Sequence, residues 1–89
     1  MSHYLGHMNS NELHVAVLQA LLELAAADRQ PSVRRLAERV GARLGAVAQA
    51  LSVLHEAGLV DATRLRLTLS GLAVAVASRS LTRPVALAA

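Results

Sequence analysis

The chain has 89 residues with nine arginines or lysines and six aspartates or glutamates, which gives a formal net charge of +3 at pH 7. This length predicts one small domain, and 54% of its residues are hydrophobic. The absence of cysteine excludes disulfide bonds, thiolate metal sites and cysteine nucleophiles. No apolar run reaches the ~18 residues of a membrane-spanning helix, and no signal peptide is visible, so we expect a cytoplasmic bacterial protein that does not enter a membrane.

The first eight residues, MSHYLGHM, have neither helical nor strand periodicity. We interpret residues 1–8 as a disordered or vector-derived segment. His3 and His7 are four residues apart, but no carboxylate or thiol accompanies them. We therefore predict no metal site in this segment.

The first predicted helix runs from Asn9 to Asp28, because Asn9 followed by Glu12 has the spacing of a capping box. Two apolar stripes occupy adjacent faces of this helix: Leu13, Val17, Ala20, Leu21 and Leu24 form one, and Val15, Leu18, Leu22 and Ala25 form the other. A helix of a one-layer domain buries a single stripe, so the second stripe favours contact with another copy of the chain. The alternative is that the C-terminal helix of the same chain covers both stripes.

Two short amphipathic helices joined by a tight turn come next. Apolar residues recur at i, i+3, i+4 and i+7 in the first of them, namely Val33, Leu36, Ala37 and Val40, with Ser32 placed as the N-cap. Gly41 follows the last apolar position, where a left-handed residue turns the chain sharply. The second helix repeats the pattern with Val47, Ala50, Leu51 and Leu54, and Gly58 ends it.

A short hairpin and a last helix complete the predicted domain. Residues 59–61 and 64–67 are predicted strands, the second because polar and apolar residues alternate in it, and only two residues separate them. Thr68 or Ser70 is the predicted N-cap of the last helix. That helix is apolar on nearly every side, so we expect it to be buried all round, and Pro84 prevents its continuation.

The two amphipathic helices resemble the winged helix-turn-helix of bacterial transcription regulators, most of all the MarR-type and ArsR-type families. The resemblance rests on the turn glycine Gly41, the apolar faces of both helices, Gly58 and the strand that follows it. The resemblance extends from Pro31 to Arg79, and the stretch that begins at Thr68 resembles the Leu-Thr-x-x-Gly motif that opens the last helix of MarR-type proteins. It implies a mainly α fold with a small β-hairpin wing, with about four helices and two short strands. We expect a winged-helix domain over residues 9–80 and a C-terminal tail over residues 81–89.

The resemblance also implies binding to double-stranded DNA, with the second helix of the motif in the major groove. Six arginines are predicted to lie on the DNA-facing side, Arg43 near a phosphate or a guanine edge and the others at phosphates: Arg34, Arg35, Arg39, Arg43, Arg64 and Arg66. Gln49 and Ser52 offer hydrogen bonds to the groove, whereas Leu44 and Ala48 fit thymine methyl groups and a protein interface equally well. The hairpin is shorter than the wing of the related families, which argues against strong wing contacts, although Arg64 and Arg66 lie on its exposed face.

We therefore predict a small homodimeric transcriptional regulator with a dimer interface made by Leu18, Leu22, Val74 and Val76. The alternative is a winged-helix module for protein–protein interaction that does not bind DNA sequence-specifically, because the recognition face is largely apolar. We expect neither catalysis nor a cofactor, since no nucleophile motif, phosphate-binding glycine loop or pair of metal-spaced residues falls on a predicted helix or strand. His55 is interpreted as a cation at the negative end of the helix dipole.

Overall fold

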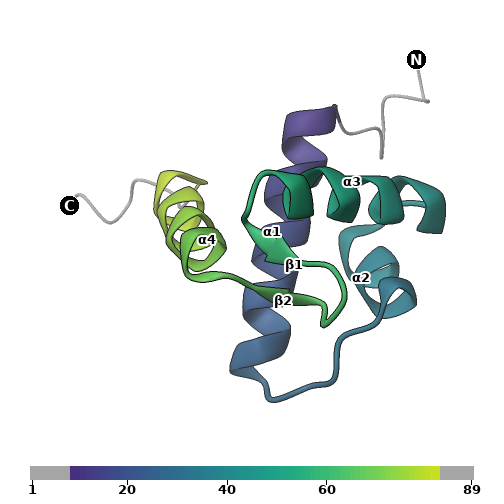
Figure 1. The fold of residues 1–89 in the computed structure, drawn as a ribbon, viewed down its shortest axis with the longest axis horizontal. Coiled ribbons are helices and arrows are strands. Elements are labelled where there is room, and N and C mark those ends of the chain that lie inside the picture. Colours follow the sequence, from purple (N-terminus) through teal and green to yellow (C-terminus); the bar gives the residue numbers. More distant parts are fainter. Residues whose placement is uncertain (1–8, 83–89) are drawn as a thin grey trace.

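The computed structural model describes residues 9–82, and the expectations for residues 1–8 and for Pro84 lie outside this range. The elements are α1 (Ser10–Ala26), α2 (Val33–Val40), α3 (Leu44–Glu56), β1 (Val60–Asp61), β2 (Arg66–Leu67) and α4 (Leu69–Thr82) (Figure 1). The two strands form one antiparallel hairpin, so the predicted content of helices plus a small hairpin is confirmed. No helix within residues 9–82 is both long enough and apolar enough to span a membrane.

Helix α1 begins with the predicted capping box. The Asn9 side chain accepts a hydrogen bond from the Glu12 backbone N–H at 2.8 Å, and the Glu12 carboxylate accepts one from the Asn9 N–H at 3.1 Å. The helix ends at Ala26, before the predicted Asp28, whose left-handed φ of 57° is incompatible with a continuing helix. Helix α1 runs through the middle of the molecule (Figure 1) and packs against the other three helices and β2.

Helices α2 and α3 are joined by a turn of residues 41–43, as the sequence predicts. The Ser32 hydroxyl caps α2 by accepting a hydrogen bond from the Arg35 N–H at 3.0 Å. Gly41 is left-handed, with φ 78°, and its N–H donates to the Ala37 carbonyl at 2.8 Å. The absence of a Cβ at this position lets α2 end and the chain reverse within three residues.

A single apolar core joins these elements. At its centre Val17 of α1, Leu36 of α2 and Val47 of α3 have no exposed surface (0%). The other buried apolar side chains of the described residues come from all four helices and β1: Leu18, Ala20, Leu21, Leu24, Ala37, Ala50, Leu51, Leu54, Val60 and Ala75. Burial of each leucine or valine side chain contributes about 1.5–3 kcal/mol relative to exposure, so this shared core holds the helices together.

The hairpin is shorter than predicted and its turn is longer. Val60 pairs with Leu67 and Asp61 with Arg66, so the expected strand over residues 64–67 is wrong in its first half. Leu65 has a left-handed φ of 52°, which an extended strand does not allow. Its half-buried side chain packs against the core, and this contact offsets the ~1–2 kcal/mol that a left-handed leucine costs.

Helix α4 starts at Leu69 and is capped by Thr68, whose hydroxyl oxygen accepts a hydrogen bond from the Gly71 N–H at 3.0 Å. Of the two predicted caps, the structure therefore selects Thr68. The helix reaches Thr82, two residues into the expected tail. Within residues 69–79 only Gly71 and Ala75 are buried, so the all-round burial expected for this helix is not reached in the single chain.

Gly71 marks a close approach of α4 to the residue that precedes β1 and to β2. A Cβ at this position would overlap the carbonyl oxygen and carbon of Leu59 and would lie 3.2 Å from the Cδ2 atom of Leu67. Backbone atoms cannot move aside as a side-chain end can, so only glycine allows this packing.

We predict that Gly71→Ala lowers the free energy of unfolding by at least about 1–3 kcal/mol, because α4 must move away from Leu59. Gly45→Ala is the matched control: the glycine lies in α3 with nothing within 4 Å of an added Cβ. This control should stabilise the protein by about 0.5–1 kcal/mol through higher helix propensity. Urea unfolding followed by circular dichroism measures both changes, and equal stabilities of the two variants would contradict the close approach.

Candidate nucleic-acid interface

The candidate interface is the end of the molecule formed by α2 and α3, which lies on the opposite side of α1 from α4 (Figure 1). Helix α3 turns Val47, Ala50, Leu51 and Leu54 toward the core. The 3.6-residue period then places Gly45, Gln49, Ser52 and Glu56 in one exposed row on the opposite side. The sequence-predicted recognition residues Gln49 and Ser52 are therefore both accessible to a ligand.

Apolar side chains flank this exposed row. Leu44 is 48% exposed, and Ala48, one turn later on the same side, is also exposed, as the sequence analysis assumes. On the other side of the row Val53 is 44% exposed, a position that the sequence analysis missed. The predicted buried side of α3 already leaves Val53 about 110° from its centre, so the helix period could have found this position. The outward face of α3 thus presents apolar groups beside a few neutral polar ones.

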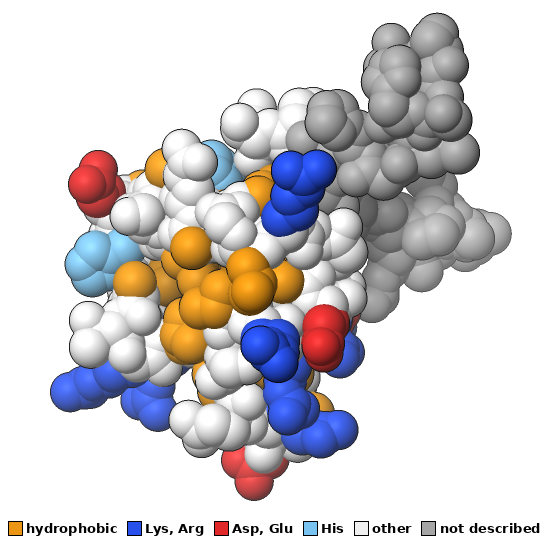
Figure 2. Space-filling view, turned by 90° about the vertical axis from the view of Figure 1, so that its right-hand side faces the viewer, with side chains coloured by type: hydrophobic (Ala, Val, Ile, Leu, Met, Phe, Trp, Pro, Cys, Tyr) orange, Lys and Arg blue, Asp and Glu red, His pale blue; other side chains and the backbone are white. Residues whose placement is uncertain are grey.

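Figure 2 views the molecule from the α2 and α3 end and shows an apolar patch with arginine side chains around it. Leu44 and Ala48 are exposed on α3, and Val33 and Val40 are half-buried on α2. Carboxylates are visible as well, two at the edge of the view and one among the arginines beside the patch. The face therefore has an apolar centre and a mainly cationic border, which suits a ligand with apolar groups between anionic ones.

The six predicted DNA-contacting arginines are all exposed, but the structure divides them into two groups. Arg34, Arg35, Arg39 and Arg43 belong to α2 and the start of α3. Arg64 and Arg66 instead line a hollow of about 550 Å³ whose other walls are the end of α1, the following loop and the start of α4. The hollow was not predicted, because it depends on how the hairpin packs against α1 and α4.

Two of these arginines have carboxylate partners. The Nε atom of Arg39 donates to Glu23 of α1 at 3.0 Å, and the Nε of Arg64 lies 4.0 Å from an Asp61 oxygen. Both pairs are substantially exposed, so each contributes less than about 1 kcal/mol and leaves other guanidinium donors available. The remaining four arginines have no carboxylate of residues 9–82 within 4.0 Å of their side-chain nitrogens. They are Arg34, Arg35, Arg43 and Arg66.

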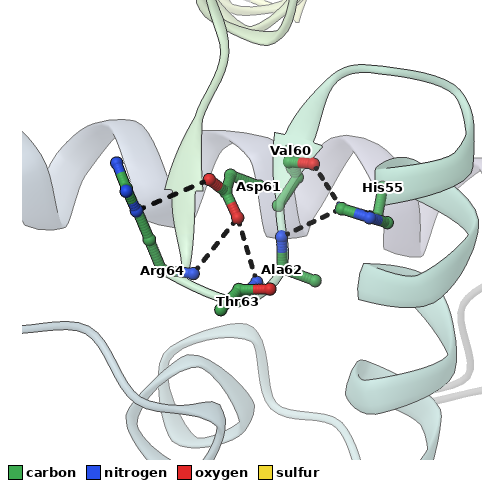
Figure 3. Close-up of polar contacts among 6 residues, drawn as sticks. All are labelled: His55, Val60, Asp61, Ala62, Thr63 and Arg64. Atoms are coloured by element: carbon green, nitrogen blue, oxygen red, sulfur yellow. Dashed lines mark hydrogen bonds and ion pairs between the residues drawn. The ribbon is translucent and has the colours of Figure 1, made fainter.

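His55 lies in the last turn of α3, where the sequence predicts it, and it also links α3 to the hairpin. Its Nδ1 atom lies 3.1 Å from the Val60 carbonyl oxygen and 3.2 Å from the Ala62 N–H nitrogen (Figure 3). A protonated Nδ1 donates to Val60, and an unprotonated Nδ1 accepts from Ala62, so the ring makes one of these bonds at a time. In either case the hairpin is held at the end of α3.

Asp61 shapes the hairpin turn. One of its carboxylate oxygens accepts from the Thr63 N–H at 3.1 Å and from the Arg64 N–H at 3.3 Å (Figure 3). Aspartate often replaces a backbone acceptor in this way and thereby favours a turn over a strand. These bonds explain why Arg64 belongs to the turn and not to β2.

The predicted dimer-interface residues have different environments in the single chain. Leu18 is 2% exposed and belongs to the core, so its side chain is already covered by its own chain and is not available to a second copy. Leu22 is half-buried and lines the hollow. Val74 and Val76 of α4 are 37% and 49% exposed. The second predicted stripe of α1 is thus only partly covered within the chain, since Leu18 is buried, Val15 and Leu22 are half-buried and Ala25 is exposed.

Within residues 9–82, no three histidine, aspartate or glutamate side chains are grouped so that they could hold a metal ion. In comparisons with known proteins, no family model matches the chain, and neither a curated protein nor a solved structure is significantly similar to it. The residues and their arrangement therefore carry the functional argument.

We predict that Asp61→Ala destabilises the hairpin turn by about 0.5–1.5 kcal/mol, because two backbone N–H groups lose their acceptor. Asp61→Asn keeps an acceptor oxygen and should remain close to the parent protein. Amide hydrogen exchange at Thr63 and Arg64 measures the effect locally. Unchanged exchange in Asp61→Ala would show that the carboxylate does not hold the turn.

Proposed function

We propose that this protein is a small homodimeric transcriptional regulator that binds double-stranded DNA through a winged helix-turn-helix. The observation that carries the proposal is the arrangement of α2, a three-residue turn and α3, with the outward row of α3 exposed and arginines beside it. In helix-turn-helix docking the second helix enters the major groove and the first crosses the backbone, which are the roles we assign to α3 and α2. Such a regulator acts in the cytoplasm, the location expected from the sequence.

Phosphate contacts are assigned to the arginines at the α2 and α3 end. Arg34 and Arg35 lie in the first turn of α2, and Arg43 directly precedes α3 as its N-cap without a side-chain capping bond. Their guanidinium groups are exposed and remain free of carboxylates of the described residues. Arg39 is a weaker candidate because Glu23 occupies its Nε donor. Arg64 and Arg66 of the wing face the hollow and receive a secondary role.

A second candidate function is a winged-helix module for protein–protein interaction. The observation that favours it is the exposed apolar surface of α3, where Leu44 is 48% and Val53 is 44% exposed. Glu56 ends the outward row with a negative charge, which phosphates repel. A partner for this face would be another protein with a complementary apolar surface. DNA-binding measurements distinguish the two candidates.

The proposed homodimer uses the outer face of α4. Leu69, Leu72 and Val76 are 86%, 40% and 49% exposed, and the helix period places them with Ala73 on the side that faces away from Gly71 and Ala75. An apolar helix face of this kind is typical of an interaction surface. Together with Leu22, which lines the hollow beside Leu69 and Leu72, this face forms the interface we propose. Val74, two residues before Val76 and therefore on the opposite flank of α4, is left out along with the buried Leu18.

We predict that binding to mixed-sequence duplex DNA falls steeply with salt concentration, because several arginines displace counterions from phosphates. Arg35→Ala should weaken binding to all sequences alike and reduce the salt slope by about 1 per protomer. Arg43→Ala should weaken binding by about 1–3 kcal/mol at a preferred sequence if this side chain holds a base edge. Fluorescence anisotropy with labelled duplexes over a series of salt concentrations provides the measurement.

Asn11→Asp is the charge control for these two variants, since it also lowers the net charge by one, at an exposed position in the first turn of α1 to which we assign no DNA contact. It should leave the affinity and the salt slope nearly unchanged. Equal effects of Asn11→Asp and Arg35→Ala would show that only net charge matters. Absence of binding at low salt would exclude the DNA-binding proposal and favour the protein-interaction module.

We predict that the parent chain is a dimer at micromolar concentration and that Val76→Glu converts it to a folded monomer. The side chain is already 49% exposed, so the charge opposes association without disturbing the core. Val53→Glu, at a similarly exposed valine of α3, is the control and should remain dimeric. Light scattering gives the mass and circular dichroism the fold; a monomeric parent protein would refute the interface.

A further inference from the structure

The outward face of α3 carries an inference about sequence preference, which rests on the proposed DNA binding. We propose that this site selects A·T base pairs and recognises thymine by its C5-methyl group, with Leu44 and Ala48 as the methyl-contacting residues. Both side chains are exposed on the same flank of α3 and lie one helical turn apart. They belong to the N-terminal part of the helix, where the candidate recognition surface begins.

Groups that read guanine are scarce on this face. Arginine and lysine recognise guanine by donating to its O6 and N7 atoms, and α3 contains neither residue. Arg43 directly precedes the helix and is a cation that could serve this purpose. Glu56 could accept from cytosine, but it lies about 18 Å along the helix from Leu44, whereas the first turns of a recognition helix contact the bases.

Other exposed residues of α3, Gln49 and Ala48, fit the two bases of an A·T pair. The Gln49 side-chain amide can make two hydrogen bonds to the N6 and N7 atoms of adenine. Ala48 precedes it and presents a methyl group, which matches the thymine methyl on the same groove edge. Gly45, in the first turn, has nothing within 4 Å of an added Cβ, so the helix backbone can approach the bases there.

The apolar flank also acts against G·C pairs. An apolar side chain pressed on the O6 of guanine or the N4 of cytosine removes water from that group without offering a hydrogen bond, which is unfavourable. Against a thymine methyl group, the same contact removes apolar surface of both partners from water. Leu44, which is 48% exposed in the free chain, has the most apolar surface to bury.

The test uses the full chain and two duplexes of equal length and alternating A·T sequence, one with thymine and one with deoxyuridine, which lacks only the C5-methyl group. We expect the deoxyuridine duplex to bind about fourfold more weakly for each methyl group that is buried. Leu44→Ala should reduce this thymine preference. Val53→Ala, which shortens a similarly exposed side chain on the other flank, should leave the preference unchanged.

The outcomes separate this inference from the proposed function. Salt-dependent binding with equal affinity for the two duplexes would overturn the methyl readout and leave DNA binding intact. A thymine preference that persists fully in Leu44→Ala would overturn the assignment of Leu44 as a methyl contact, because the preference would then come from Ala48 alone or from duplex stiffness. Absence of binding to either duplex at low salt would remove the proposed function and the inference together.

Discussion

The burial of α1 between the other helices is the constraint on which the rest of the structure depends. Helices α2 and α3 and the hairpin are too short to form cores of their own, and each buries its apolar side chains against α1. Val17, Leu36 and Val47 meet at 0% exposure in the centre of this arrangement. Because α2 and α3 share that core, the angle between them is fixed by packing, and the outward row of α3 is presented as a rigid surface.

Features that depend on residues close together in the sequence could be predicted. The caps by Asn9 and Ser32 and the turn at Gly41 involve residues within four positions of one another, and all three are confirmed. Contacts between distant elements could not be predicted in this way. The pairing of Arg39 with Glu23 joins residues 16 positions apart, and it depends on the rotation of α2 against α1. The burial of Leu18 likewise depends on how the helices pack around α1.

In the candidate site, too, local features could be predicted from the sequence and contacts between distant elements could not. The exposed positions of α3 follow from its apolar period, so the accessibility of Gln49 and Ser52 was predictable. The grouping of the arginines was not, because the hairpin turn places Arg64 and Arg66 beside α1 and α4. The alternation of polar and apolar residues indicated a strand, but two hydrogen bonds to Asp61 and the left-handed Leu65 produce a turn instead. Fewer cations therefore lie at the α2 and α3 end than the sequence predicts. Apolar contacts are expected to make a larger contribution to binding at this surface.

The hydroxyl of Thr68 does more than cap α4. It accepts from the Gly71 N–H at 3.0 Å and donates to the Gly58 carbonyl at 2.7 Å, while the Thr68 N–H donates to the Leu59 carbonyl at 3.1 Å. One residue thus ties the chain that leaves α3 to the chain that enters α4. The close packing of Gly71 against the Leu59 backbone lies at the same place. These contacts together couple the orientation of α4 to that of α3. In the proposed homodimer built on α4, this junction would therefore set the distance between the two α3 helices, and with it the spacing of the two DNA half-sites that such a dimer would bind.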